Sequence, residues 1–313
     1  MFKDIILAIT PSEICECAAD KAFAFAQRFE SKLYLVHICG IEHGWGSMEH
    51  LEASGETARI KDKIMAYYGD KLEGIKDYEV IVRAGIPHNE ILRLVRQKNA
   101  DLVVMGPHTK KYVEERSRMW GMAGSTLERV SQRCPCPVMI VTRQAPYGEQ
   151  VFNKVLVATD FSDPAECAVN YGAQMARHYK SELVVFHAMD QEELPQEEVE
   201  QRVEAAKNRM SVEYGPRLAG ISASSFECWE GKASTEILKT ARIHKADLII
   251  MAHHTREVDP EKAVLGSTVV QVALNSSAPT MSVNKHFDLR CGLMYDQTGE
   301  ATEAGSAAAP AES

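Results

Sequence analysis

The chain has 313 residues, of which 45% are hydrophobic and 25% are charged. These values are typical of soluble globular proteins, and the length leaves room for two domains with substantial cores. The formal net charge of −9 argues against a nucleic-acid partner, because no surplus of basic residues exists to displace counterions from phosphates, although a local basic patch remains compatible with this total. The amino terminus lacks the pattern of a secretory signal, and no apolar run approaches the ~20 residues needed to cross a bilayer. We therefore expect a cytoplasmic protein without membrane contact.

Short β-branched apolar runs alternate with longer segments of helical period along the chain. Residues 1–143 show the same order of elements as the second half, where the sequence predicts a buried strand over 154–160 and a helix over 163–180. Asp163 is the predicted N-cap of that helix, and Pro164 takes its first helical position. The next predicted elements are a strand over 181–187, a long charged amphipathic segment over 191–214, a strand over 224–229, a helix over 233–244, a strand over 247–251, a helix over about 264–275 and a strand over 279–283.

The chain repeats itself at an offset of 150 positions (187 − 37), since residues 1–37 align with residues 151–187 without a gap. Such a period is too long for a solenoid repeat, so each copy is predicted to be a whole domain. Further matching stretches are 84–109 with 230–255 and 124–141 with 266–283.

Strands that are joined by helices of this length pair in parallel through right-handed crossovers, which places helices on both faces of one sheet. Each half is therefore predicted to be a doubly wound α/β domain with a parallel sheet of five strands. We expect a first domain over 1–143, a linker over 144–150, a second domain over 151–286 and a C-terminal extension over 287–313. From about residue 298 this extension consists of small and acidic residues with nothing to bury, which predicts disorder.

The eight cysteines are too few for a disulfide framework in a chain of this size, and a reducing compartment would keep them as thiols. Two C-x-C pairs, Cys15 with Cys17 and Cys134 with Cys136, could indicate metal or redox chemistry. Ordinary structural thiols fit better, because C-x-x-C is absent and the second copy has Ser276 and Ala278 in place of the latter pair.

Ligands of an open parallel sheet bind beyond the carboxyl ends of its strands, where the strand order reverses. A phosphate also suits the start of the following helix, because free backbone N–H groups, the helix dipole and two hydroxyl groups meet there. The second-half candidates at this edge are Thr159, Asp160, His187, Met251, Ala252, Thr255, Gly266, Ser267 and Thr268. The weaker first-half set consists of Thr10, His37, Met105, Gly106, Thr109, Gly124, Ser125 and Thr126.

This arrangement resembles the universal stress protein family, as two tandem copies that cover almost the whole chain. The family motif has a glycine after the fourth strand, a second glycine three residues on, and a later Gly with Ser or Thr that opens a helix. The final part is intact in both copies. Gly106 matches the first glycine, Ala252 replaces it in the second copy, and Thr109 and Thr255 replace the second glycine.

In the ATP-binding members that the chain resembles, an Asp at the end of the first strand contacts the ribose. Asp160 stands at that position, whereas the first copy has Thr10. Side chains at the glycine positions hinder the approach of backbone to a phosphate, although Thr supplies a hydroxyl group and Ala is the smallest replacement. If one half binds a nucleotide, the resemblance favours the second.

The resemblance implies a stress-response regulator that binds ATP or another adenine nucleotide mainly in the second domain, with Mg²⁺ as a possible companion of the nucleotide. It also implies a pseudo-dimer within the chain, formed by the last strands at 137–141 and 279–283, and leaves a homodimer and an unknown protein partner open. We expect no enzyme beyond a very slow ATPase, because no catalytic base, metal cage or arginine finger is evident.

Two alternatives remain. The chain could be a nucleotide-independent scaffold with degenerate loops. Metal-assisted hydrolysis through the edge histidines ranks below the nucleotide-binding regulator and below the scaffold. Histidines without a Cys or carboxylate partner at fixed spacing are more typical of a polar ligand cleft than of a metal site. These histidines are His37, His108, His187, His253 and His254.

Other conspicuous residues have plain structural interpretations. Asp101 and Asp247 are predicted to be helix-to-strand turn residues, and Gly85 and Gly231 to form tight turns. The first copy also carries a Gly-rich stretch at 40–50, which covers the cleft, meets a partner or is an ordinary surface loop.

Overall fold

The structure is a computed structural model. It describes residues 1–10, 16–39, 48–106, 125–143, 151–190, 195–252, 267–283, 293–295 and 301–303. The first half contains β1 (Asp4–Ala8), α1 (Glu16–Phe29), β2 (Lys32–Cys39), α2 (Met48–Ala53), α3 (Glu56–Leu72), β3 (Tyr78–Ala84), α4 (Pro87–Lys98), β4 (Leu102–Met105), α6 (Ser125–Arg133) and β5 (Val138–Ile140).

The second half repeats this order. Its elements are β6 (Lys154–Thr159), α7 (Asp163–Tyr179), β7 (Glu182–Met189), α8 (Gln196–Tyr214), a 3₁₀ turn (Gly215–Leu218), β8 (Ser224–Glu230), α9 (Ala233–Ile243), β9 (Leu248–Ala252), α10 (Ser267–Asn275) and β10 (Thr280–Val283). Two short strands, β11 (Leu293–Tyr295) and β12 (Ala301–Glu303), follow and pair antiparallel with each other. The structure thus gives a strand at 301–303, where the sequence predicts disorder, because backbone pairing with β11 satisfies its polar groups.

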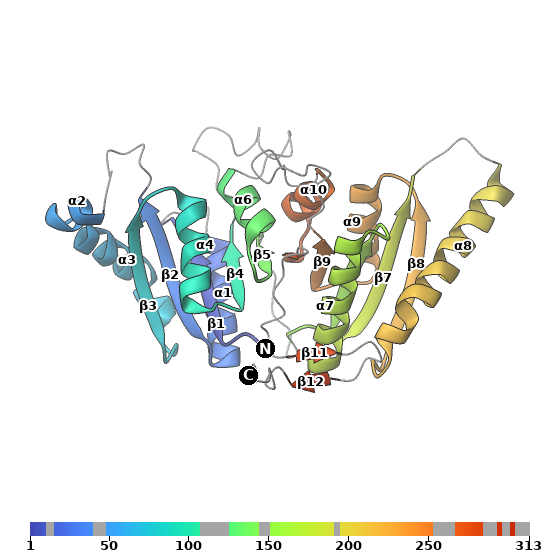
Figure 1. Cartoon of the computed structure of the whole chain (residues 1–313), viewed down its shortest axis with the longest axis horizontal. Coiled ribbons are helices and arrows are strands. Elements are labelled where there is room, and N and C mark those ends of the chain that lie inside the picture. Colours follow the sequence, from blue (N-terminus) through green and yellow to red (C-terminus); the bar gives the residue numbers. More distant parts are fainter. Residues whose placement is uncertain are drawn as a thin grey trace, which may run out of the picture.

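One continuous sheet of ten strands runs through both halves in the order β3-β2-β1-β4-β5-β10-β9-β6-β7-β8 (Figure 1). Within each half all strands are parallel, which confirms the doubly wound α/β fold. The last strands of the two halves, β5 and β10, pair antiparallel with Met139 opposite Met281, as predicted. We call this β5–β10 pairing the seam. Next to it, the Thr142 hydroxyl donates to the backbone carbonyl of Ala273, at 3.1 Å.

Helices cover both faces of the sheet and bury two cores that each include residues of both halves. Because side chains alternate along a strand, Ile5 and Leu7 of β1 face one core and Ile6 faces the other. The core around Ile5 packs against α1, α3, α7 and α8, and the core around Ile6 packs against α4, α6, α9 and α10. In the described residues, no helix is both long enough and apolar enough to span a bilayer.

Aromatic rings of the two halves pack against each other on the face of the sheet that α1 and α7 cover. The Phe25 and Phe152 ring centroids lie 5.6 Å apart, and those of Phe29 and Tyr179 also lie 5.6 Å apart. Such pairs add about 0.5–1.5 kcal/mol each beyond the area that they bury. The halves are therefore joined by side-chain packing as well as by the seam.

Half-buried carboxylates hold the start of each half, at the sheet edge opposite the predicted ligand site. Asp101 Oδ2 accepts from the backbone N–H groups of Lys3 and Asp4, at 2.8 and 3.0 Å. Asp247 Oδ2 accepts in the same way from Asn153, at 2.8 Å, and from the residue after it. Burial raises the pKa of both carboxyl groups. The prediction that both are structural turn residues is confirmed.

The two turn glycines are also confirmed. Gly85 and Gly231 have φ values of +146° and +143°, which side-chain-bearing residues rarely adopt. A Cβ atom would lie 2.9 Å from Glu90 at the first position and 3.0 Å from Glu236 at the second.

Two predictions about local structure are wrong by one or two residues. The N-cap of α7 is Ser162 and not Asp163, because the Ser162 hydroxyl accepts from the backbone N–H of Ala165. Strand β7 continues to Met189, two residues beyond the predicted end, so His187 lies inside a strand. The longer strand pairs with β8 up to Met189 opposite Glu230.

Candidate functional site

The strand order places one residue of each half at the point where ligands of such sheets bind. Strand β6 lies between β7 and β9. The chain therefore continues from β6 to β7 on one side of it and later returns to β9 on the other side. Asp160 directly follows β6 at this switch point and is exposed. Thr10 follows β1 in the first half, where β1 lies between β2 and β4.

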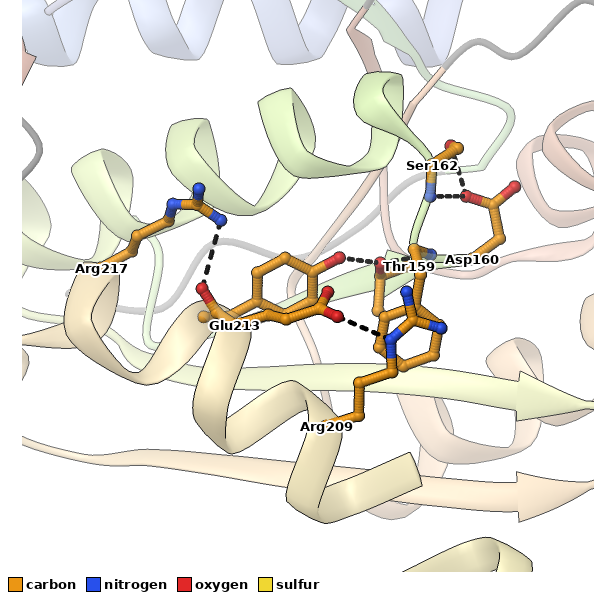
Figure 2. A network of polar contacts seen from close by, with 8 residues as sticks. Thr159, Asp160, Ser162, Arg209, Glu213 and Arg217 are labelled. Carbon is orange, nitrogen blue, oxygen red and sulfur yellow. Dashed lines mark hydrogen bonds and ion pairs between the residues drawn. The ribbon is translucent and has the colours of Figure 1, made fainter. Parts of the chain in front are cut away.

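The Asp160 carboxylate folds back onto the start of α7. Its Oδ1 atom accepts from the backbone N–H of Ser162, at 3.1 Å, and from the Ser162 hydroxyl, at 2.5 Å (Figure 2). Ser162 in turn caps α7, so the carboxylate and the helix start form one rigid turn. Both of these hydrogen bonds use Oδ1, which leaves Oδ2 as an acceptor for a ligand.

Phe161, between these two polar residues, adopts the left-handed conformation with φ +62°. This conformation costs a residue with a Cβ atom about 1 kcal/mol or more. It is held by a hydrogen bond from the Phe161 N–H to Thr159 Oγ1, at 3.1 Å, and by contact of its ring with His187, at 4.6 Å between centroids. The Thr159 hydroxyl also bonds the Tyr214 hydroxyl of α8, at 2.9 Å.

Helix α8 adds a positive charge at this strand end. The guanidinium carbon of Arg209 lies 3.9 Å from the centroid of the Phe161 ring, a cation–π contact. Its Nε atom donates to Glu213 Oε1, at 2.6 Å, and Arg217 donates to the Glu213 backbone carbonyl (Figure 2). Arg217 also pairs with Glu166 of α7. We call Thr159, Phe161, Arg209 and Tyr214 the α8 clamp.

Both strand histidines have one ring nitrogen fixed by the backbone. His187 Nδ1 donates to the Thr159 carbonyl, at 2.9 Å, and His37 Nδ1 donates to the Ile9 carbonyl, at 3.0 Å. A carbonyl only accepts, so Nδ1 carries the proton in both rings. Over the described ranges, no three His, Cys, Asp or Glu side chains gather as metal ligands do. His108, His253 and His254 lie outside the described residues.

The structure places the other second-half candidates in different environments. The Met251 side chain is 5% exposed and belongs to the core, so its predicted contact with a ligand is limited to its backbone. Ala252 is the last residue of β9 and pairs with Val283, whereas the family motif has a loop glycine there. Thr268 is half-buried in the first turn of α10, which Ser267 opens. Thr255 and Gly266 lie outside the described residues.

The first-half candidates form a poorer site. Ile9 stands where the second half has Thr159, so the hydroxyl that anchors the α8 clamp has no counterpart. The Met105 side chain is buried in the core, and its carbonyl accepts from the N–H of Val141, at 3.0 Å. Gly106 is buried after β4. Ser125 opens α6 and Thr126 is half-buried in its first turn, while Thr109 and Gly124 lie outside the described residues.

Sequence reasoning missed Phe161, Arg209 and Tyr214. The sequence signal for Phe161 was its position as an aromatic residue within the otherwise polar stretch Thr-Asp-Phe-Ser. No local pattern indicates that Arg209, 48 positions further along the chain (209 − 161), lies over its ring.

Comparison with known proteins identifies the relatives of each half. The model of the universal stress protein family matches residues 1–142 and again residues 152–284. A universal stress protein of Methanocaldococcus jannaschii is 29% identical over 152 residues, which cover 46% of this chain and 84% of that protein. A putative universal stress protein of Staphylococcus aureus is 26% identical over 151 residues, which cover 46% of this chain and 87% of that protein. The crystal structure of a universal stress protein from Archaeoglobus fulgidus shares the fold across both halves, with a TM-score of 0.61 at 20% identity over 90% of this chain and 96% of that one.

Proposed function

Because the chain belongs to the universal stress protein family, we propose that it is a cytoplasmic stress-response regulator that holds an adenine nucleotide, ATP, ADP or AMP, in its second half. The observation that carries this proposal is the exposed Asp160 carboxylate at the switch point of the second half. A carboxylate oxygen is a strong acceptor for the paired hydroxyl groups of a ribose.

The residues of the second half fit the parts of a nucleotide. Asp160 Oδ2 would accept from a ribose hydroxyl, while Oδ1 keeps its bonds to Ser162. The first turn of α10 offers backbone N–H groups and the Thr268 hydroxyl to a phosphate. A Mg²⁺ ion would bind through the phosphates, since Mg²⁺ sites in proteins often use substrate oxygens and water.

The first half is proposed as the weaker site or as no site. Thr10 offers a hydroxyl group where Asp160 offers a charge, and hydrogen bonds to charged groups are worth about 1.5–3 kcal/mol against about 1 for neutral ones. The proposal includes no rapid chemistry, because Asp160 Oδ1 is already bonded to Ser162, whose hydroxyl serves as the cap of α7.

Replacement of Asp160 by Asn tests the proposal. The Asn amide oxygen still accepts from Ser162, so the turn and the cap of α7 are kept, while the second carboxylate oxygen becomes an amide donor. We expect roughly 10- to 100-fold weaker binding of ATP or AMP in calorimetry, from the loss of about 1.5–3 kcal/mol. Thr10→Ala is the matched control in the first half and should leave the affinity within about twofold of wild type. Equal affinity of Asp160→Asn and wild type would refute the assignment.

A specific observation favours a second candidate, the nucleotide-independent scaffold. Ala252 extends β9 in place of a loop glycine, which restricts the approach of backbone to a phosphate. A ligand that binds the folded state at 100 times its Kd stabilises it by about 2.7 kcal/mol. If millimolar ATP, ADP and AMP all leave the thermal midpoint of the wild type unchanged, the scaffold is the correct function and the nucleotide proposal fails.

A further inference from the structure

A pair of cysteines lies close together in the turn that connects α6 to the seam strand β5. The Sγ atoms of Cys134 and Cys136 are 3.5 Å apart, within hydrogen-bond contact. Cys134 is completely buried and Cys136 is 7% exposed. Sequence spacing alone favours ordinary thiols here, and the short distance between the sulfurs is new information from the structure.

The turn itself does not need the cysteines. At its start the Cys134 N–H donates to the Val130 carbonyl, at 2.9 Å, which ends α6. The second half makes the same bond between the Ser276 N–H and the Val272 carbonyl, at 2.8 Å, and it has Ala278 at the position of Cys136. The two thiols are therefore a feature of the first half that backbone geometry does not require.

The backbone around the pair is preorganised. Pro135 lies between the two cysteines and Pro137 follows them, and each ring fixes φ near −65°. The Pro137 carbonyl accepts from the N–H of Val103, at 3.0 Å, which ties the turn to β4. A bonded pair of sulfurs is about 2.05 Å apart, so closure requires a movement of about 1.5 Å, within the reach of side-chain rotation. Little conformational entropy is left to lose when the bond forms.

We propose that Cys134 and Cys136 are a redox modification site, which a hydroperoxide converts from a dithiol to an intramolecular disulfide. The Cys136 thiolate attacks one oxygen of hydrogen peroxide and the O–O bond breaks, which yields a sulfenic acid and, after protonation of the leaving hydroxide, water. The Cys134 sulfur then attacks the sulfenic sulfur, the S–S bond forms and a second water leaves. The two thiols lose two electrons in total, and the peroxide gains them.

The direction of attack follows from exposure. Cys136 retains some contact with solvent and Cys134 has none, so a small oxidant meets Cys136 first. The neighbouring thiol then captures the sulfenic acid before further oxidation, because the two sulfurs are already in contact. The neighbouring sulfur, and not exposure, distinguishes Cys136 from Cys39 and Cys228, which are 7% and 6% exposed.

Peptide mapping tests the proposal directly, because trypsin cuts after Arg133 and Arg143 and thus releases both cysteines in one peptide, 134–143. The full-length folded protein is exposed to hydrogen peroxide, unfolded in the presence of a thiol-alkylating reagent and digested with trypsin. The peptide masses are then measured by mass spectrometry. We expect this peptide to lose both alkylation sites and to be about 2 Da lighter than the unalkylated dithiol peptide. Dithiothreitol given before alkylation should restore both sites.

Two variants complete the test. The double variant Cys134→Ser and Cys136→Ala has the residues of the second half at these positions and should fold with wild-type stability. Under peroxide it should lose two fewer thiols per chain than the wild type. The single variant Cys134→Ser removes the second thiol, so Cys136 should accumulate as a sulfenic acid that dimedone traps. The proposal is overturned if peptide 134–143 keeps both alkylatable thiols under peroxide that oxidises other cysteines of the chain. It is also overturned if wild-type Cys136 is oxidised to the sulfinic acid without a disulfide.

Discussion

Gly172 lies where helix α7 packs closely on the sheet, and its replacement by Ala tests how tightly this core is packed. A Cβ atom on Gly172 would lie 2.3 Å from Val157 Cγ2, and 3.6 Å from both Ile250 Cδ1 and Leu183 Cδ1. Carbon atoms in contact normally lie about 3.5–4.0 Å apart, so Val157 or the helix must move by more than about 1 Å. Val157 is completely buried and its β-branched side chain has little rotamer freedom.

Two effects oppose each other at this position. Ala is a better helix former than Gly by about 1 kcal/mol, whereas an overpacked core costs about 1–3 kcal/mol. Because the clash falls on a stiff side chain and not on the end of a flexible one, we expect the packing cost to exceed the gain. The free energy of unfolding of Gly172→Ala should be lower than that of wild type by about 1–2 kcal/mol.

Urea unfolding followed by circular dichroism at 25 °C provides the measurement. Gly69→Ala is the matched control, since Gly69 also lies inside a helix, α3, but a Cβ atom there would meet nothing within 4 Å. That variant should be more stable than wild type by up to about 1 kcal/mol. If Gly172→Ala is as stable as Gly69→Ala, the close packing of α7 on β6 is refuted.

The first half supplies a rescue for the same experiment. It has Ala22 at the position of Gly172 and Leu7 at the position of Val157, and both are completely buried. Leu lacks the branch at Cβ that causes the clash. The double variant Gly172→Ala and Val157→Leu should therefore lose less stability than the sum of its single variants, and a double-mutant cycle measures this difference.

Three further predictions concern polar groups, of which Lys21 and Thr159 are buried and Asp247 is half-buried. Burial lowers the pKa of Lys21 from 10.5 to about 8 in the folded protein, so the unfolded chain binds more protons between these pH values. The free energy of unfolding should accordingly rise with pH across this window, by about 3 kcal/mol more in wild type than in Lys21→Met, in urea titrations of both proteins. A parallel pH dependence in the two would disprove the shift. Thr159→Val removes the hydroxyl that holds Tyr214 and the Phe161 turn, so we expect a loss of about 1–3 kcal/mol in stability and, if the second half binds AMP, weaker affinity in calorimetry. Unchanged thermal midpoint and affinity would contradict the α8 clamp. Asp247→Ala leaves two backbone N–H groups without their acceptor and should cost about 1–3 kcal/mol by urea unfolding, with no change in AMP affinity. A loss of affinity without a loss of stability would contradict its structural role.

Patterns in the sequence were sufficient to predict the fold of each half, whereas the pairing of the two halves through their last strands was predicted from the resemblance to the family. Alternating apolar runs and helical periods depend on neighbours along the chain, and the 150-residue offset shows which segments are equivalent. The structural roles of Asp101 and Asp247 were also predictable from local sequence. An Asp in a turn between a helix and a strand commonly accepts hydrogen bonds from nearby backbone N–H groups.

The candidate site was less predictable because tertiary contacts form much of it. Ser162 rather than Asp163 caps α7, since the cap depends on which side chain the turn brings to the Ala165 N–H. Arg209 comes from a helix whose orientation relative to β6 is set by packing and not by its own sequence. The side chain of Met251 was assigned to the ligand site, but strand alternation directs it into the core.

The antiparallel seam has a consequence for how this chain could diverge during evolution. In a dimer of two identical subunits, every substitution at the contact appears twice, because the same surface of both subunits forms it. Here the two strands are separately encoded, and they already differ, because β10 has Thr280 and Ser282 where β5 has Val138 and Ile140. Because one polypeptide carries both copies, each copy can change alone, and the two now differ in that the second half has Asp160 and the first half has the cysteine pair.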